Sequence, residues 1–161
     1  METIFALSSG SPPAGIAVIR VSGPGAGKAL LSLAGSLPEP RHASLRHFRD
    51  ADGQLLDTGL ALWFPGPNTA TGEDLAELHL HGGRAVVAAV ATALGAIDGL
   101  RPAQPGEFTR RAFANGRIDL AEAERLADLL AAETEWQRRA AMELASGSFS
   151  GRLEGWRERL L

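Results

Sequence analysis

The sequence pattern changes once along the chain, near residues 102–106, and this change constrains the fold more than any other feature. Residues 1–100 contain short β-like runs separated by glycine and proline, the strongest local breakers of regular structure. Residues 101–161 instead follow an almost continuous helical pattern. The chain is therefore expected to join a strand-rich part to a helical part, with a change of architecture and no flexible linker between them.

The strand-rich part is predicted from β-branched, aromatic and alternating segments. The predicted strands are residues 3–7, 16–21, 45–48, 60–64 and 75–81, and the third and fourth form a hairpin around a turn at 50–53. Residues 16–21 form a nearly continuous apolar run, which predicts a strand buried on both faces. Helices are predicted over residues 24–33, 85–94 and 105–114.

A further helix is predicted to begin after Asp119. Asp119 and Glu122 have the spacing of a capping box, in which each side chain bonds the other's backbone N–H. An apolar stripe follows at helical spacing: Leu120, Ala123, Leu126, Ala127, Leu130, then Trp136, Ala140 and Leu144. The stripe returns at Phe149, Leu153, Trp156 and Leu160. This last stripe predicts a missing partner, either another subunit or further chain, unless the helix folds back on its own domain.

Composition excludes several classes of protein. The 161 residues include no cysteine, which excludes a disulfide scaffold, a thiolate zinc site and a cysteine nucleophile. A net charge of −3 argues against a large sequence-independent nucleic-acid surface but leaves room for a small RNA-contacting patch. Arg110 and Arg111 are predicted to lie on a helix surface. No apolar run approaches the ~20 residues of a membrane span, so a cytoplasmic protein is expected.

Residues 22–29 (SGPGAGKA) resemble a phosphate-binding P-loop only superficially. That motif needs four residues between its glycines and a hydroxyl after the lysine, because the loop wraps a phosphate and the hydroxyl reaches Mg²⁺. Here Gly23 and Gly27 enclose three residues, and Ala29 replaces the hydroxyl. The segment is predicted to be a helix with small residues for close packing.

Glu77, His79 and His81 share one face of a predicted strand, since side chains alternate with a period of two. Three interpretations stay open: a metal or acid–base site, a solvated strand face, and a polar ligand pocket floored by the strand. The following Gly82 and Gly83 permit a tight exit from the strand and a close approach by a ligand.

Arg20 interrupts the apolar run 16–21. A guanidinium group in a buried strand must be paired or must face a ligand. It could form an ion pair with a carboxylate such as Glu77, or clamp an anionic group of a ligand. Arg117 lies in a tight connection between two predicted helices, where it is either solvated or, beside a pocket, a second clamp.

Four stretches together resemble the MnmE (TrmE) family of tRNA modification GTPases. They are AVIRVSGP (17–24), TGEDLAELHLHGG (71–83), PGEFTRRAFANGRIDLAEAERLADLL (105–130) and LASGSFSGRL (144–153), in the family's order and spacing. The resemblance implies an α+β fold, with a mixed β-sheet related to the folate-binding fold of the glycine-cleavage T-protein. It implies a tetrahydrofolate-binding and dimerisation domain over residues 1–118 and the start of a helical domain over 119–161.

The resemblance also implies a ligand, a site and partners. The ligand is a tetrahydrofolate derivative, with 5-formyl- or 5,10-methylene-tetrahydrofolate as candidates, and the family's folate-contacting positions fall on Arg20, Glu77 and Arg117. A pterin presents two adjacent N–H donors that suit one carboxylate, and a folate tail carries carboxylates that suit arginine. A homodimer, the FAD protein MnmG and tRNA are the implied partners, and the implied product is an aminomethyl-type group on the wobble uridine.

The chain departs from the family pattern in several places. Arg117 stands where the family usually has lysine, residues 10–13 alter a Pro-Pro-Gly loop, and Ala70 replaces a common aromatic residue. The family's GTPase domain, which binds GTP, Mg²⁺ and K⁺, and its cysteine-containing tail have no counterpart in these residues. We therefore expect a binding module that hydrolyses no GTP by itself. Two alternatives remain: a metal-dependent enzyme using Glu77, His79 and His81, and a purely structural dimerisation domain.

Overall fold

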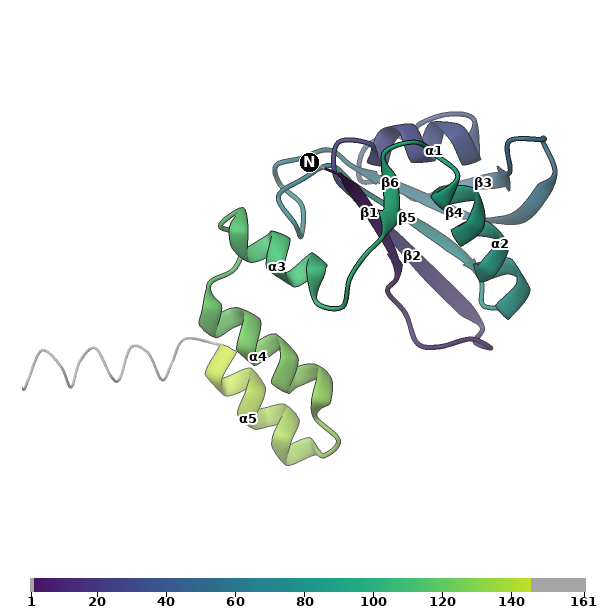
Figure 1. Ribbon diagram of the computed structural model, residues 1–161. Coiled ribbons are helices and arrows are strands. Elements are labelled where there is room, and N and C mark those ends of the chain that lie inside the picture. The colour runs from purple at the N-terminus through teal and green to yellow at the C-terminus, as the bar shows by residue number, and fades with distance from the viewer. Residues whose placement is uncertain (1, 146–161) are drawn as a thin grey trace, which may run out of the picture. The chain divides into compact units, whose positions relative to one another are not determined.

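The computed structural model describes residues 2–145 of the chain. These residues belong to two compact units that divide between Asn115 and Gly116. The first unit holds all the strands of the described part together with three helices, and the second unit holds two further helices (Figure 1). The observed class is α+β, as the family resemblance predicts.

The first unit is built on one mixed sheet. Its six strands lie in the order β3-β4-β5-β2-β1-β6, and all neighbouring pairs are antiparallel except β1 and β6, which are parallel. The strands are β1 (Thr3–Leu7), β2 (Ile16–Ser22), β3 (Ser44–Arg49), β4 (Leu55–Phe64), β5 (Leu75–His81) and β6 (Leu100–Pro102). The helices of this unit are α1 (Ala26–Ala34), α2 (Arg84–Gly95) and α3 (Glu107–Ala114).

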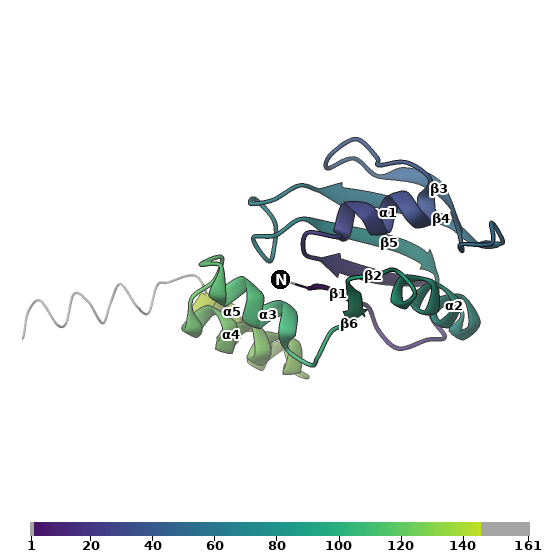
Figure 2. The ribbon, with the colours of Figure 1, turned by 45° about the horizontal axis from the view of Figure 1, so that its top comes forward.

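Helices α1 and α2 lie on the same face of the sheet (Figure 2), and the core forms between them and the strands. Inward-facing side chains of the central strands, such as Ile19 and Leu78, are fully buried there. Leu30 of α1 and Val90 and Leu94 of α2 cover them from the other side. The face turned away from α1 and α2, which we call the outer face, therefore carries the side chains available for other roles.

Two glycines set how closely the strands and loops approach. A Cβ at Gly59 would lie 2.0 Å from the carbonyl oxygen of His79, and one at Gly82 would lie 2.3 Å from the carbonyl oxygen of Ala14. Any larger residue would push these backbone segments apart. At Gly82 the close approach is made by the backbone of Ala14.

The predicted strands and helices are observed, with four main differences. β4 begins at Leu55, five residues before the predicted start at residue 60, because Asp57 and Gly59 are residue types that are rare in strands. Residues 16–21 are not buried on both faces: Ile16 is 64% exposed, because no helix covers the outer face there. β6 was not predicted, because three residues are too few to show a periodic pattern. α3 begins at Glu107, two residues later than its prolyl start predicts, because Gly106 adopts a left-handed conformation with φ of 73°.

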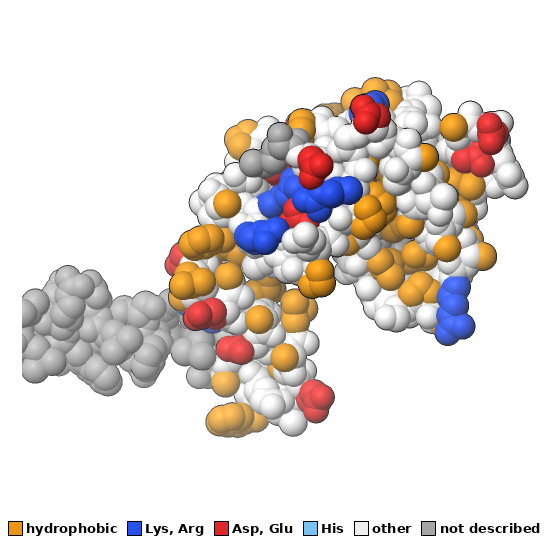
Figure 3. All heavy atoms as spheres, viewed as in Figure 1, with side chains coloured by type: hydrophobic (Ala, Val, Ile, Leu, Met, Phe, Trp, Pro, Cys, Tyr) orange, Lys and Arg blue, Asp and Glu red, His pale blue; other side chains and the backbone are white. Residues whose placement is uncertain are grey.

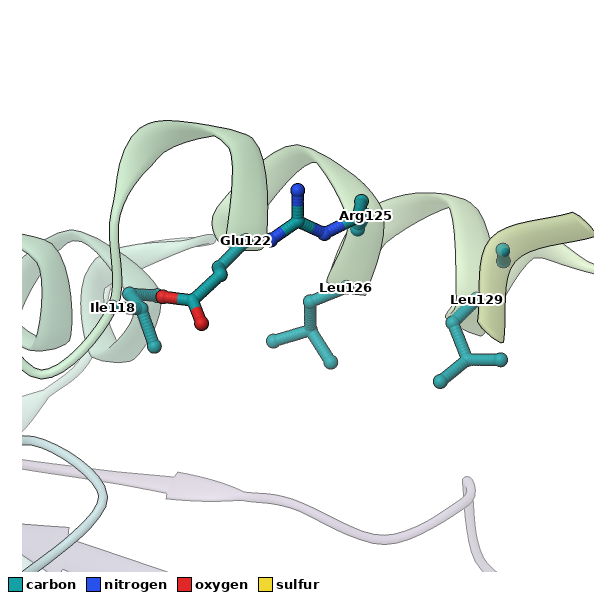
Figure 4. A pocket seen from close by; sticks show the side chains of 6 residues that line it. Ile118, Glu122, Arg125, Leu126 and Leu129 are labelled. Carbon is teal, nitrogen blue, oxygen red and sulfur yellow. The ribbon is translucent and has the colours of Figure 1, made fainter. Parts of the chain in front are cut away.

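The second unit contains α4 (Leu120–Ala131) and α5 (Glu135–Ala145), which pack against each other. The predicted capping box is present: Asp119 Oδ1 accepts the N–H of Glu122, and Glu122 Oε2 accepts the N–H of Asp119. A shallow hollow of about 260 Å³ runs along α4, between Ile118 and Leu129 (Figure 4).

The apolar stripe of the second unit is largely exposed within the described residues. Leu130 and Trp136 are each 79% exposed, and Leu120 is 61% exposed. The last part of the predicted stripe, from Phe149 onward, lies outside the described residues.

Candidate functional site

The outer face of the sheet brings polar residues of three strands into rows. Residues paired directly across neighbouring strands point to the same face. One row contains Arg20 of β2, Glu77 of β5 and Leu62 of β4. The next row contains His79 of β5 and Leu60 of β4. A polar group is therefore placed in the middle of the sheet, with apolar neighbours on β4.

Arg20 and Glu77 form an ion pair in this row. Arg20 donates to Glu77 Oε1 from both Nε, at 3.0 Å, and Nη2, at 2.7 Å. The Glu77 side chain is 16% exposed, and that of Arg20 is 34% exposed. This geometry confirms the ion-pair interpretation of Arg20, and the partial exposure leaves the guanidinium within reach of a ligand on the outer face.

His79 completes the group by contacting the other oxygen of the same carboxylate. Its Nε2 lies 3.0 Å from Glu77 Oε2, with the His79 side chain 31% exposed. Burial raises the pKa of Glu77, but the hydrogen bonds from His79 and Arg20 together outweigh it and hold that pKa below its ordinary value. Glu77 is therefore an ionised acceptor at neutral pH. We call Arg20, Glu77 and His79 the open cluster.

His81 does not join this cluster, although it shares the strand face. Its Nδ1 lies 2.8 Å from Asp57 Oδ1, and its backbone N–H donates to Asp57 Oδ2 at 2.8 Å. Among residues 2–145, no three His, Cys, Asp or Glu side chains are placed to hold a metal ion. The metal-site alternative therefore lacks the convergent ligands it requires, because Asp57 holds His81 away from Glu77.

A hollow of about 240 Å³ lies beside the open cluster, on the side of His79. His79 and His81 of β5, Ile16 of β2, and Thr58 and Leu60 of β4 line it. Pockets that enclose a whole drug-sized ligand measure roughly 300–1,000 Å³. The hollow can thus accept one ring system of a larger ligand, with mixed apolar and imidazole walls.

The far end of the same face is closed by a second polar group, which sequence reasoning missed. Ser22 follows Arg20 on the outer side of β2 and donates to Glu73 Oε2 at 2.7 Å. Arg111 of α3 donates to Glu73 Oε2 at 3.1 Å and to Glu107 Oε1 at 3.1 Å. We call Ser22, Glu73, Glu107 and Arg111 the closed cluster. The prediction that Arg111 lies on a helix surface is wrong, because α3 turns this residue inward.

Arg101 also binds the closed cluster, through two bonds to Glu107 at 2.7 and 2.9 Å. Figure 3 shows acidic and basic side chains gathered beside α3 and the N-terminus. The hydrogen bonds from Arg101 and from the backbone of Gln104 hold the pKa of Glu107 well below its usual range, despite burial. The spacing of Glu107 and Arg111, four residues apart on a helix, was the one local signal for this group.

Of the three predicted site residues, the structure brings Arg20 and Glu77 together. Arg117 lies in the turn before α4 and belongs to the second unit. Its convergence with the other two stays a prediction.

Known proteins match this chain both in a family model and along its whole length. Residues 3–117 match the family described as "GTP-binding protein TrmE N-terminus". Over 161 residues the chain is 68% identical to the tRNA modification GTPase MnmE of Novosphingobium aromaticivorans and 65% identical to that of Erythrobacter litoralis. These matches cover 99% and 100% of the chain but only 37% and 38% of the relatives. No helix within residues 2–145 is long and apolar enough to cross a membrane.

Proposed function

Because the chain belongs to the TrmE (MnmE) family, whose N-terminal region it matches over residues 3–117, we propose that it is a tetrahydrofolate-binding and dimerisation module of a tRNA modification GTPase. The observation that carries the proposal is the Arg20–Glu77 pair on the open part of the outer face. An ionised carboxylate and a guanidinium side by side, both within reach of solvent, suit a ligand that has N–H donors and acidic groups.

The open cluster offers the chemistry that a reduced folate needs. The pterin ring presents an N–H and an amino group in parallel, and one carboxylate can accept both. The hollow beside His79 supplies apolar walls for a ring, and arginine suits the glutamate tail. In this proposal Glu77 holds the pterin, Arg20 and Arg117 hold anionic parts of the ligand, and the derivative is 5-formyl- or 5,10-methylene-tetrahydrofolate.

A second copy of the chain is the proposed cover for the apolar part of the outer face, which includes Ile16 and Leu60 at the walls of the hollow. Leu45 of β3 and Leu60 of β4 are paired directly and are 65% and 39% exposed, and Ile16 of β2 is 64% exposed. Exposed aliphatic side chains of this size favour burial against another protein surface. The homodimer would also explain why Ile16, Leu45 and Leu60 are left exposed on this face.

The wider role proposed for the chain follows from its relatives, of which it spans 37–38%. The module would carry a one-carbon unit while an FAD protein of the MnmG type shares the modification of the wobble uridine of tRNA. GTP, Mg²⁺ and K⁺ would bind outside these residues, in the GTPase part of longer family members. The proposed location is the cytoplasm.

Isothermal titration calorimetry with 5-formyl-tetrahydrofolate tests the proposal. The unaltered chain should bind, and Glu77→Ala and Arg20→Ala should each abolish detectable binding. Arg49→Ala is the matched control, because Arg49 lies on β3 and donates to the carbonyl of Gly53, away from the open cluster. Unchanged affinity in both Glu77→Ala and Arg20→Ala would contradict the assignment of the folate site to these residues. A dimer that binds no folate would favour the purely structural alternative.

A further inference from the structure

The Glu77 carboxylate already has most of its acceptor positions filled by the protein. A carboxylate offers about four lone-pair sites, two on each oxygen. Arg20 places two donors on Oε1, at 3.0 and 2.7 Å, and His79 places one on Oε2, at 3.0 Å. One site on Oε2 therefore stays open, whereas Oε1 has none.

This count restricts how a ligand can bind. Two parallel N–H donors on one ring need either one site on each carboxylate oxygen or two sites on the same oxygen, as Arg20 uses on Oε1. Oε2 has only one open site beside His79, so the second donor needs Oε1. Such a ligand can use Oε2 directly, but it can use Oε1 only after Arg20 gives up at least one of its two bonds. The residue left holding the carboxylate at that moment is His79.

We propose that His79 is a positioning residue for Glu77, which keeps Oε2 and the carboxylate plane fixed while Arg20 turns from Oε1 to an acidic group of the ligand. This inference rests on the proposed folate-binding function and assigns different roles to the two residues that contact Glu77. Arg20 is the exchangeable partner of Glu77, and His79 is the permanent one.

The surroundings of the two partners support that division. His79 lies on β5, whose backbone is paired on both sides, by β2 and β4, and Gly59 packs directly against its carbonyl oxygen. His79 reaches Glu77 from two residues away on the same strand, so its Nε2 has a short path to Oε2. Arg20 instead reaches across from β2 with a longer and more flexible side chain that is 34% exposed.

No other described contact could hold Glu77 in place of His79. The hydrogen bonds to its carboxylate come from Arg20 and His79 alone within residues 2–145. Across the sheet on β4, the residue paired with Glu77 is Leu62, which has no polar side-chain atom. Without His79, release of Arg20 would leave the carboxylate free to rotate.

The test compares two variants at position 79 with one matched control. His79→Leu removes the donor, and His79→Gln replaces it with an amide N–H donor. His42→Leu removes an exposed histidine before β3 that contacts the carbonyl of Pro40 and not Glu77. Calorimetry on the 161-residue chain uses 5-formyl-tetrahydrofolate and, as a second probe, p-aminobenzoylglutamate, which lacks the pterin donors. The carbon-13 shift of the Glu77 carboxyl group reports its environment without any ligand.

His79→Leu should weaken binding of 5-formyl-tetrahydrofolate by about tenfold or more, the usual effect of a hydrogen bond to a charged group. It should leave p-aminobenzoylglutamate binding unchanged within about twofold, and it should shift the Glu77 carboxyl signal. His79→Gln should recover most of the affinity, and His42→Leu should change none of these quantities. A melting temperature measured on each variant confirms folding.

The outcomes distinguish a failure of the His79 inference from a failure of the proposed folate-binding function. If the unaltered chain binds 5-formyl-tetrahydrofolate and His79→Leu binds it equally well, His79 has no positioning role. An equal loss of both probes would also overturn the inference, because it would indicate general damage to the site. If the unaltered chain does not bind at all while the Glu77 signal still responds to His79→Leu, the folate function itself fails.

Discussion

The open and closed clusters lie on the same face of one sheet, yet they are built for different tasks. Both join a glutamate to an arginine, and both include a residue of β2, Arg20 in one and Ser22 in the other. In the closed cluster the Glu107 side chain is 3% exposed and receives four hydrogen bonds from the protein. In the open cluster the arginine is 34% exposed and the carboxylate keeps one free acceptor site. These differences are the reason for assigning a structural role to the closed cluster and for proposing the open cluster as the binding site.

Removing the centre of the closed cluster should have the largest effect on stability. Glu107→Ala leaves Arg111 buried with half of its charge partners, and breaking a buried pair in this way costs about 3–5 kcal/mol. Urea unfolding followed by circular dichroism measures the change. A loss below ~1 kcal/mol would mean that the closed cluster is no more structural than a surface ion pair.

Acid should weaken the closed cluster through the same residue. Hydrogen bonds from Arg101 and Gln104 lower the pKa of Glu107 in the folded chain relative to the unfolded chain, where it is close to its ordinary value of 4.5. The unfolded chain therefore binds more protons as the pH falls through about 4.5, and stability decreases below that pH. Glu107→Gln should flatten this decrease, and an equal slope in both proteins would contradict the account.

Adding a methyl group at Gly59, against the strand that carries Glu77 and His79, should have an intermediate effect on stability. Gly59→Ala places a methyl group 2.0 Å from the His79 carbonyl oxygen, so β4 and β5 must separate locally. Forcing extra atoms into a tight contact costs about 1–3 kcal/mol. Gly10→Ala is the control, because Gly10 lies in the loop after β1, has no left-handed φ, and a Cβ there meets nothing within 4 Å. If both variants lose the same stability, the close contact at Gly59 is not the cause.

Removing the centre of the open cluster should have the smallest effect on stability. Glu77→Ala breaks a pair whose arginine can turn to solvent, so a loss of about 1 kcal/mol or less is expected. The urea midpoint checks this value beside that of Glu107→Ala. A loss as large as that of Glu107→Ala would remove the distinction between the two clusters, because Glu77 would then be a structural residue.

The sequence was sufficient to predict features that depend on residues close to one another along the chain. Alternation placed Glu77 and His79 on one strand face, and the spacing of Asp119 and Glu122 predicted a capping box that is present. The pair between Arg20 and Glu77 was among the stated possibilities, because a guanidinium inside an apolar strand demands a partner. The strand face and the capping box need no knowledge of the tertiary fold, whereas the Arg20–Glu77 pair joins residues 57 positions apart and could be named only as one possibility.

Features that depend on distant segments were not predictable in this way. Arg111 was assigned to a helix surface because nothing near it in sequence indicates Glu73, which lies 38 residues away. The exposure of Ile16 depends on which face of the sheet the helices cover, and an apolar run alone does not specify that. The closure of one end of the outer face, and with it the site of ligand access, is a property of the tertiary structure.

The most direct test of the central claim asks which end of the outer face a reduced folate contacts. Backbone amide shifts of the isotope-labelled chain, recorded with and without 5-formyl-tetrahydrofolate, report both clusters in one experiment. The account predicts changes at Arg20, Glu77 and His79, and none at Ser22, Glu73 or Glu107. Changes confined to the closed end, or no changes anywhere in the spectrum, would contradict it.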